Sequence, residues 1–228
     1  MSETKKRLVL ESGPSGTGKT PKIKAIVKEY GQSFGRIILT TSRLRREGEV
    51  DKIDYYFKTA DEIMGMPNDE IVARGSVRGE MIQAISKEAV NDAFERNDLV
   101  YVEAYPSLGE NLLRWIKTQS DCSFEIRTVA FIPISWEEIT QCSKSMRLPP
   151  EEIVYLTVKG KLERRGKDKP ENIEKRARLA YYEMTLMRGY QHTIVCHVGE
   201  DEIEQWGEKL GFEPLRAKEE MLQIMDLT

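Results

Sequence analysis

The chain has 228 residues, of which 39% are hydrophobic and 32% are charged. This length and composition predict one α/β domain with its own hydrophobic core, and they exclude a disordered chain. The 35 basic and 38 acidic residues nearly cancel. A protein that coats nucleic acid needs a clear basic excess, so we expect no nucleic-acid partner.

Cysteine, histidine and apolar segments indicate the compartment. The cysteines are isolated and odd in number, and only two histidines are present, at Cys122, Cys142, Cys196, His192 and His197. They predict neither a disulfide framework nor a zinc site. The N-terminal MSETKKRLVLES contains an apolar run of about four residues, too short for a signal sequence or a membrane span. We therefore expect a cytoplasmic protein without a membrane partner.

Apolar runs alternate with helical patterns along the chain. Strands are predicted at 7–12, 35–42, 99–106, 126–134 and 192–198. Helices are predicted at 20–31, at 79–97, over a long charged region 135–190 with breaks at RLPP and RRGKDKP, and in the tail 214–228. In 79–97 the apolar residues at helical spacing are Met81, Ile82, Ile85, Val90 and Phe94. This alternation predicts a mostly parallel sheet covered by helices on both faces.

The segment GPSGTGKT directly follows the first predicted strand and opens the first predicted helix. It matches G-x-x-x-x-G-K-[ST] in full, with Gly13, Pro14, Ser15, Gly16, Thr17, Gly18, Lys19 and Thr20. The glycines let successive backbone N–H groups point at one phosphate, Lys19 can reach the outer phosphates, and the Thr20 hydroxyl can bind Mg²⁺. A chance glycine-rich turn is the alternative. The strand before it and the helix after it favour a site for a nucleoside triphosphate such as ATP with Mg²⁺.

The segment TTSRLRREGEVDKIDYYF (40–57) could be a solvated charged loop, a nucleic-acid patch or a clamp for one phosphate. Arg43 and Arg46 lie three residues apart, so their guanidinium groups can converge on one phosphate, and the Tyr55 hydroxyl can complete the cage. A nucleic-acid patch would need further basic stretches with aromatic residues at intervals. The sequence favours the phosphate clamp.

At this point the sequence resembles the guanylate kinase family. The family pattern G-P-S-G-x-G-K is followed by S-x-T-T-R-x-P-R-x-G-E-x-x-G-x-x-Y-x-F, and here GPSGTGKT is followed by LTTSRLRREGEVDKIDYYF. FIPISWEEI (131–139) is similar to I-x-P-P-S-x-E-E-L, and KLERRGKDKPENIEKR (161–176) is similar to the lid pattern R-L-x-x-R-G-T-D-x-x-x-x-I-x-x-R. The resemblance covers roughly residues 7–200.

The resemblance implies a P-loop NTPase three-layer α/β fold in one domain. Its core would comprise about 1–38, 98–140 and 177–228, its insertion for the nucleoside monophosphate about 39–97, and its helical lid about 141–176. Lys19, Arg46, Arg165 and Arg176 would then be catalytic, with the two lid arginines closing over the transferring phosphoryl group. Glu103 would organise Mg²⁺ together with Thr20, or it would simply cap a neighbouring loop.

The chain departs from the family pattern mainly on the acceptor side. The family serine before the first clamp arginine is Leu39, and Thr41 can supply the missing hydroxyl because it lies two residues on, on the same strand face. The family proline before the second clamp arginine is Arg45. This third cation is either solvated, ion-paired or a direct ligand.

The base-reading segment departs further, in NDEIVARGSVRGEM (68–81). Asp69 or Glu70 stands near the family carboxylate, and the tyrosine and hydroxyl positions fall on Arg78 and Glu80. A second base-reading aspartate falls on Tyr105. Either Glu80 accepts from the base while Arg74 or Arg78 donates to it, or Arg78 and Glu80 form a surface pair.

Three functions follow as hypotheses. The first is an ATP-dependent nucleoside monophosphate kinase, with GMP or dGMP as acceptor by resemblance, working as a monomer or homodimer. The second keeps this chemistry but takes a modified nucleotide or another phosphorylated metabolite. The third is a non-catalytic binding module, which Lys19 and Thr20 disfavour because scaffold versions of the family commonly lose the phosphate loop.

Overall fold

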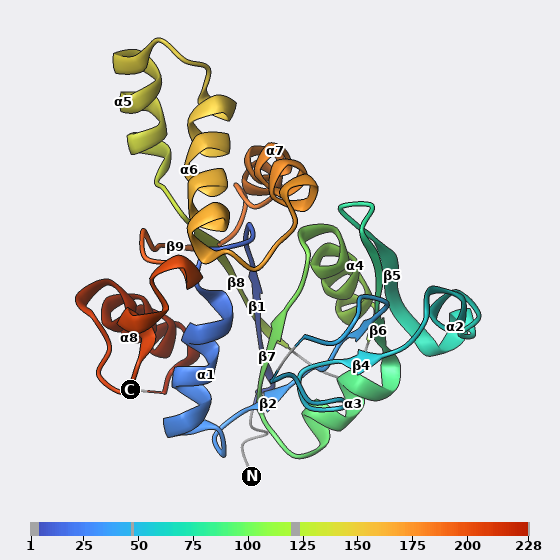
Figure 1. Cartoon of the computed structure of the whole chain (residues 1–228). Coiled ribbons are helices and arrows are strands. Elements are labelled where there is room, and N and C mark those ends of the chain that lie inside the picture. Colours follow the sequence, from blue (N-terminus) through green and yellow to red (C-terminus); the bar gives the residue numbers. More distant parts are fainter. Residues whose placement is uncertain (1–4, 47, 120–123, 228) are drawn as a thin grey trace. The chain divides into compact units, whose positions relative to one another are not determined.

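The computed structural model describes residues 5–46, 48–119 and 124–227, so that Cys122 lies outside the described residues. The chain divides into two compact units. Unit 1 comprises residues 1–11 and 32–127, and unit 2 comprises residues 12–31 and 128–228. Figure 1 labels the helices and strands of both units and colours them along the sequence.

Unit 1 contains two groups of hydrogen-bonded strands. Three strands have the order β2–β7–β1, and their pairing is parallel throughout. Four short strands have the order β4–β3–β6–β5, in which β3–β4 is parallel and the other pairs are antiparallel. The strands are β1 (Arg7–Ser12), β2 (Gly35–Arg36), β3 (Thr40–Thr41), β4 (Tyr56–Phe57), β5 (Ile71–Val77), β6 (Met81–Ser86) and β7 (Leu99–Glu103). The helices are α2 (Ala60–Met64), the 3₁₀ helix η1 (Asn68–Glu70), α3 (Lys87–Glu95) and α4 (Pro106–Lys117).

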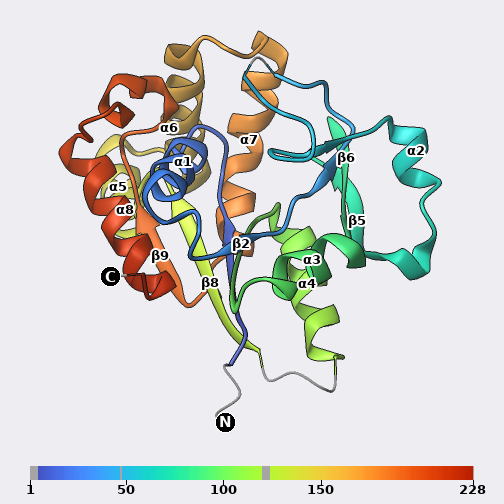
Figure 2. The same ribbon diagram turned by 90° about the horizontal axis from the view of Figure 1, so that it is seen from below.

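Unit 2 contains the helix after the phosphate loop and most of the helical region. Its parallel strand pair is β8 (Glu125–Ile132) and β9 (His192–Val195), in register from Val129–His192 to Ile132–Val195. Its helices are α1 (Lys19–Tyr30), α5 (Trp136–Met146), α6 (Pro150–Arg165), α7 (Pro170–Leu186), the 3₁₀ segment η2 (Glu200–Trp206) and α8 (Phe212–Met225). Helices α6 and α7 pack side by side (Figures 1 and 2) around a buried cluster that includes Val158, Leu162 and Ala177.

Local sequence signals explain where the helices of unit 2 begin and end. Helix α5 begins with a capping box, because the Ser135 hydroxyl accepts from the Glu138 N–H at 3.1 Å while the Glu138 carboxylate accepts from the Ser135 N–H at 2.8 Å. Pro150 and Pro170 stand at the first positions of α6 and α7, where a missing N–H costs nothing. Gly166 ends α6 with φ +65°, the left-handed conformation that glycine adopts readily. The breaks predicted at RLPP and RRGKDKP are therefore confirmed.

The prediction of alternating strands and helices with mostly parallel pairing is also confirmed for the core strands. Two elements were predicted wrongly. The strand expected at 35–42 is two short strands, β2 and β3, which belong to different sheets. The helix expected at 79–97 is strand β6 followed by helix α3.

The change from strand to helix within 79–97 has a local cause. Arg78 and Gly79 have φ +55° and +63°, and the Glu80 N–H donates to the Val77 carbonyl at 3.0 Å. This β-turn, with Arg78 and Gly79 at its centre, makes β5 and β6 a hairpin (Figure 2), and the ladder takes up the backbone groups of β6. Ser86 then caps α3 by accepting from the Ala89 N–H at 3.1 Å. In the part of the chain that the structure describes, no helix combines the length and the apolar character that a membrane span requires.

Candidate active site

The phosphate loop of unit 2 lies between β1 and α1, and its backbone conformation requires glycine. Gly16 and Gly18 have φ +78° and +89°, a conformation that strains any residue with a Cβ. A Cβ at Gly13 would lie 2.2 Å from the Phe131 carbonyl oxygen. The loop runs directly into the first turn of α1. The N–H groups of the loop and the helix dipole together favour a bound anion there.

The Lys19 ammonium group is folded over this loop and is almost completely buried. Its Nζ donates to the carbonyls of Gly13 at 3.0 Å and Pro14 at 2.7 Å, and to the Thr17 hydroxyl at 3.2 Å. These acceptors hold the cation in place where phosphate oxygens can replace them. Thr20 follows in the first turn of α1 and is exposed.

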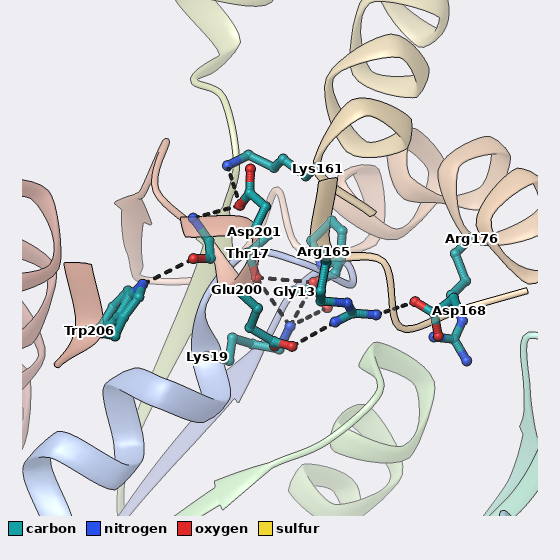
Figure 3. A network of polar contacts seen from close by, with 12 residues as sticks. Gly13, Thr17, Lys19, Lys161, Arg165, Asp168, Arg176, Glu200, Asp201 and Trp206 are labelled. Carbon is teal, nitrogen blue, oxygen red and sulfur yellow. Dashed lines mark hydrogen bonds and ion pairs between the residues drawn. The ribbon is translucent and has the colours of Figure 1, made fainter. Parts of the chain in front are cut away.

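The two predicted lid arginines meet at one carboxylate (Figure 3). Arg165 forms ion pairs with Asp168 and, at 2.6 Å, with Glu200, and Arg176 donates to Asp168 at 2.9 Å. Burial alone would lower the pKa of Arg165, but the charges of Glu200 and Asp168 outweigh it and raise that pKa. The guanidinium group is therefore held fully charged although its side chain is only 5% exposed.

One nitrogen of the buried Arg165 guanidinium donates no hydrogen bond to the described residues. Arg165 Nε is enclosed and has no hydrogen-bond partner among the described residues. A buried donor without a partner is unfavourable, so it indicates a ligand with acceptor oxygens. Figure 3 shows Arg165 on the same side as Lys19 and the loop residues Gly13 and Thr17. The arrangement fits a phosphate group.

A segment that the sequence reasoning missed closes against the phosphate loop. A Cβ at Gly199 would lie 1.9 Å from the Gly16 carbonyl oxygen, and a Cβ at Gly18 would lie 2.8 Å from the Trp206 ring. The Trp206 indole N–H donates to the Gly199 carbonyl at 3.2 Å. The segment from Gly199 to Trp206 is therefore packed directly on the loop (Figure 3).

A buried lysine–aspartate pair fixes this segment. Lys161 donates to the His197 carbonyl and lies 3.7 Å from Asp201, whose carboxylate also accepts from the Gly199 N–H at 3.1 Å and from Arg164 at 2.6 Å. Burial lowers the pKa of Lys161, and the charge of Asp201 opposes this shift. His197 itself is half exposed and contacts Glu138 at 3.0 Å.

In unit 1 the predicted phosphate clamp is organised by a residue that we did not single out, Glu49. Its carboxylate accepts from both terminal nitrogens of Arg43, at 2.7 and 2.5 Å, and from the Arg46 backbone N–H at 2.8 Å. The Arg43 guanidinium stacks over the Tyr55 ring at 4.8 Å. Glu49 is the glutamate of the family's R-x-G-E pattern, so the signal was present in the sequence.

The environments of Arg43 and Tyr55 suit an anion. Burial would lower the pKa of Arg43, but the hydrogen bonds and charge of Glu49 outweigh it and raise that pKa. Burial, followed by the nearby charge of Glu103, raises the pKa of Tyr55 to about 12, so that its hydroxyl stays a donor. Arg46 is exposed, and so is Arg45, in agreement with a solvated Arg45. Thr41 is fully buried, and its hydroxyl accepts from the Arg43 N–H at 3.5 Å.

The residues expected to read the base lie in several elements of unit 1. Asp69 lies in η1 and is exposed. Arg74 donates to three backbone carbonyls at the end of α2, from Ile63, Met64 and Met66, and so it stabilises this segment. Arg78 lies in the hairpin turn before Glu80, and its guanidinium lies over the Tyr105 ring at 5.4 Å.

Matches to known proteins decide between the families that use such loops. A family model described as guanylate kinase matches residues 5–114. The chain is 27% identical to the guanylate kinase of Listeria innocua serovar 6a over 198 residues, which cover 84% of this chain and 80% of that protein. It is 26% identical to the guanylate kinase of Streptococcus pneumoniae strain R6, over 82% of this chain and 78% of that protein.

The resemblance to the guanylate kinase family is confirmed. A crystal structure of guanylate kinase from Anaplasma phagocytophilum has the same fold, with a TM-score of 0.59 and 15% identity over 98% of this chain and 85% of that chain. These matches support a phosphotransferase of the nucleoside monophosphate kinase class.

Proposed function

We propose that the chain transfers the γ-phosphoryl group of ATP to a nucleoside 5′-monophosphate, with GMP or dGMP as the acceptor that the family suggests. The observation that carries the proposal is the buried Arg165 guanidinium beside the phosphate loop, with its Nε free among the described residues. Phosphoryl transfer needs charge neutralisation and positioning more than covalent chemistry. Lys19 and Arg165 supply the charge on the donor side, and Arg43 with Tyr55 holds the acceptor phosphate.

The residues present also fit Mg²⁺ bound with ATP. The Thr20 hydroxyl is exposed at the start of α1, where the phosphate loop opens. When bound, the ion neutralises charge on the phosphate oxygens. The proposed role of Glu103 in organising the ion or its waters rests on the family pattern. We also propose a cytoplasmic location and a monomer or homodimer, in keeping with the three isolated cysteines.

A coupled assay of ADP release tests the proposal, with each common ribo- and deoxynucleoside monophosphate offered in turn. We expect turnover with ATP, loss of turnover on chelation of Mg²⁺, and loss on Lys19→Ala. The matched control is Lys28→Ala, an exposed lysine at the other end of the same helix. Absence of turnover with every acceptor, from protein shown to be folded, would refute the proposal.

A second candidate keeps the chemistry and changes the acceptor. It is supported by the engagement of Arg74 with backbone carbonyls and by the position of Arg78 in a turn. Turnover of a modified nucleotide far above that of GMP, in the same assay, would favour it.

A further inference from the structure

Four residues of unit 1 form one row across the sheet β4–β3–β6–β5. Phe57 pairs with Thr41, Thr41 pairs with Gln83, and Gln83 pairs with Gly75. Residues paired directly across neighbouring strands project from the same face of a sheet. The side chains of this row therefore stand next to one another although they come from four separate strands.

Gln83 is the unusual member of this row. Its residue is only 8% exposed, so most of the side chain is covered by its neighbours. Its only described contact is from Nε2 to the Met81 sulfur at 3.9 Å, which is a weak acceptor. No hydrogen bond to the carboxamide oxygen is found among the described residues. Mostly covered amides normally have good partners within the protein, so the carboxamide of Gln83 is available to a partner that binds from outside.

Open space borders Gln83 on the neighbouring strand. A Cβ added at Gly75 would meet no atom within 4 Å. Gly75 is also absent from the residues with positive φ, so its backbone does not require glycine. The missing side chain leaves room on the face that carries the Gln83 amide.

The other side of Gln83 leads to the phosphate clamp. Its neighbour Thr41 accepts from the Arg43 N–H at 3.5 Å, and Arg43 is the arginine that Glu49 and Tyr55 hold. An acceptor whose phosphate lies at Arg43 therefore has the row Thr41–Gln83–Gly75 beside it. In a nucleotide, the base carries hydrogen-bonding groups at a distance from the phosphate, and a polar side chain in this row can contact them.

We propose that Gln83 is a specificity-determining residue that contacts the base edge of the acceptor nucleotide. This inference rests on the proposed function and names its acceptor-reading group. A carboxamide offers one donor beside one acceptor, as in the pairing of glutamine with the N6 and N7 atoms of adenine. A carboxylate offers acceptors only and suits the two adjacent N–H donors of guanine. The expected acceptor is a nucleoside monophosphate whose base presents a hydrogen-bond donor next to an acceptor. The residues of the row do not by themselves select guanine over such bases.

The test compares acceptor ratios in the full-length wild-type chain, Gln83→Glu, Gln83→Leu and Gly75→Ala. We measure kcat/KM for AMP, GMP, CMP and UMP, and their Kd by calorimetry without ATP. Gln83→Glu is expected to raise the GMP/AMP ratio by roughly ten- to a hundredfold, the range of one bidentate base contact. Gln83→Leu should weaken all four acceptors, and Gly75→Ala should weaken purines more than pyrimidines. The Kd for an ATP analogue should stay unchanged in all three.

Ser76→Ala is the matched control, since Ser76 is exposed on the same strand and pairs with Ile82, one step out of the Gln83 row. Gln83→Met preserves the packed volume if Gln83→Leu fails to fold. Equal losses for all acceptors, with unchanged ratios in Gln83→Glu and Gly75→Ala, would overturn base reading while leaving the proposed kinase function intact. Failure of the wild-type chain to bind or turn over any nucleoside monophosphate would overturn both.

Discussion

The proposed donor site in unit 2 and the proposed acceptor clamp in unit 1 are built in different ways. Around the phosphate loop, the contacts that a ligand would use come from backbone N–H groups, and glycines are required by φ at Gly16 and Gly18. In the acceptor clamp, side chains provide the contacts, and Glu49 holds Arg43 through a bidentate ion pair. A backbone site depends on a short run of adjacent residues, whereas a side-chain site depends on residues brought together from several strands.

The two sides also differ in how their cations are held. Arg165 is buried between Asp168 and Glu200, so each of its partners is a carboxylate that a phosphate can replace. Arg43 pairs with the Glu49 carboxylate and stacks on the Tyr55 ring. The ring can therefore keep the guanidinium group in position when a phosphate replaces the carboxylate. Donor binding should therefore be sensitive to the loss of a single charge, and acceptor binding to the local order of the loop that holds Arg43.

The largest effect is expected from Arg165→Ala. The loss of a positioned arginine costs roughly 10³-fold or more in kcat in phosphoryl-transfer enzymes. Steady-state kinetics with saturating ATP and acceptor provides the measurement. Arg178→Ala is the control, because Arg178 lies on the outer face of α7 with its side chain 57% exposed and paired with Glu174. A loss below tenfold for Arg165→Ala would contradict the role assigned to this residue.

The acceptor side should respond to Glu49→Ala. Arg43 would lose both of its hydrogen bonds to the carboxylate, and Arg46 would lose the acceptor of its N–H. Bonds to charged groups contribute about 1.5–3 kcal/mol, so we expect KM for the acceptor to rise roughly 10- to 100-fold while KM for ATP is unchanged. Asp54→Ala removes another carboxylate from the same loop, one that among the described residues accepts only from the Val50 N–H, and should change KM less. Equal increases for both substrates would argue against a local clamp.

The same contrast explains what could be predicted from the sequence. The phosphate loop, the helix breaks at Pro150 and Pro170 and the strand–helix alternation were predictable because each depends on local chemistry. Residues 79–97 were predicted wrongly because β6 is buried on both faces in part, so that its apolar residues fit a helical spacing as well as an alternating one. The decisive signal, Arg-Gly at the centre of the hairpin turn, is weaker than the usual Asn-Gly.

The candidate site was predictable where charges recur at fixed spacing and not where they come from distant segments. Arg165 and Arg176 were expected in one place, and the structure brings both to Asp168. Glu200 lies 35 residues from Arg165 in the sequence, and no local pattern joins them. The proposed role of Gln83 could not be predicted from the wrong helix assignment, because it depends on the pairing of Gln83 with Thr41 and Gly75 across the sheet.

A smaller effect is expected where the segment after β9 packs on the phosphate loop. In Gly199→Ala the new Cβ would meet the Gly16 carbonyl oxygen at 1.9 Å, so the loop or the segment must shift. Overpacking of this kind costs about 1–3 kcal/mol of the free energy of unfolding. We expect a lower Tm and weaker binding of an ATP analogue, with unchanged binding of the acceptor. Gly189→Ala is the control, because a Cβ at Gly189 meets no atom within 4 Å. Unaltered ATP affinity would show that this packing does not shape the donor site.

The smallest expected effect is on the pH dependence of folding stability, which differs between a group in unit 2 and a group in unit 1. Burial raises the pKa of the Cys196 thiol in unit 2 from 9.0 to about 11. Burial, with the charge of Glu103, raises that of Tyr55 in unit 1 from 10.0 to about 12. A group that stays protonated in the native state favours folding below its unfolded pKa, and this contribution is lost as the pH rises through the native pKa. Stability should therefore fall between pH 9 and 11 through Cys196 and between pH 10 and 12 through Tyr55.

Urea unfolding of Cys196→Ala and Tyr55→Phe separates the two contributions. Each substitution should remove the decline in its own pH window and leave the other, although either can shift the overall stability. Tyr55→Phe should in addition raise the KM for the acceptor, because the hydroxyl proposed to donate to the acceptor phosphate is lost, whereas Cys196→Ala should leave it unchanged. A Tyr55→Phe chain that keeps the full decline between pH 10 and 12 would mean that the phenol is as accessible to hydroxide in the folded state as in the unfolded one. The tyrosine could not then form the closed wall of a phosphate clamp.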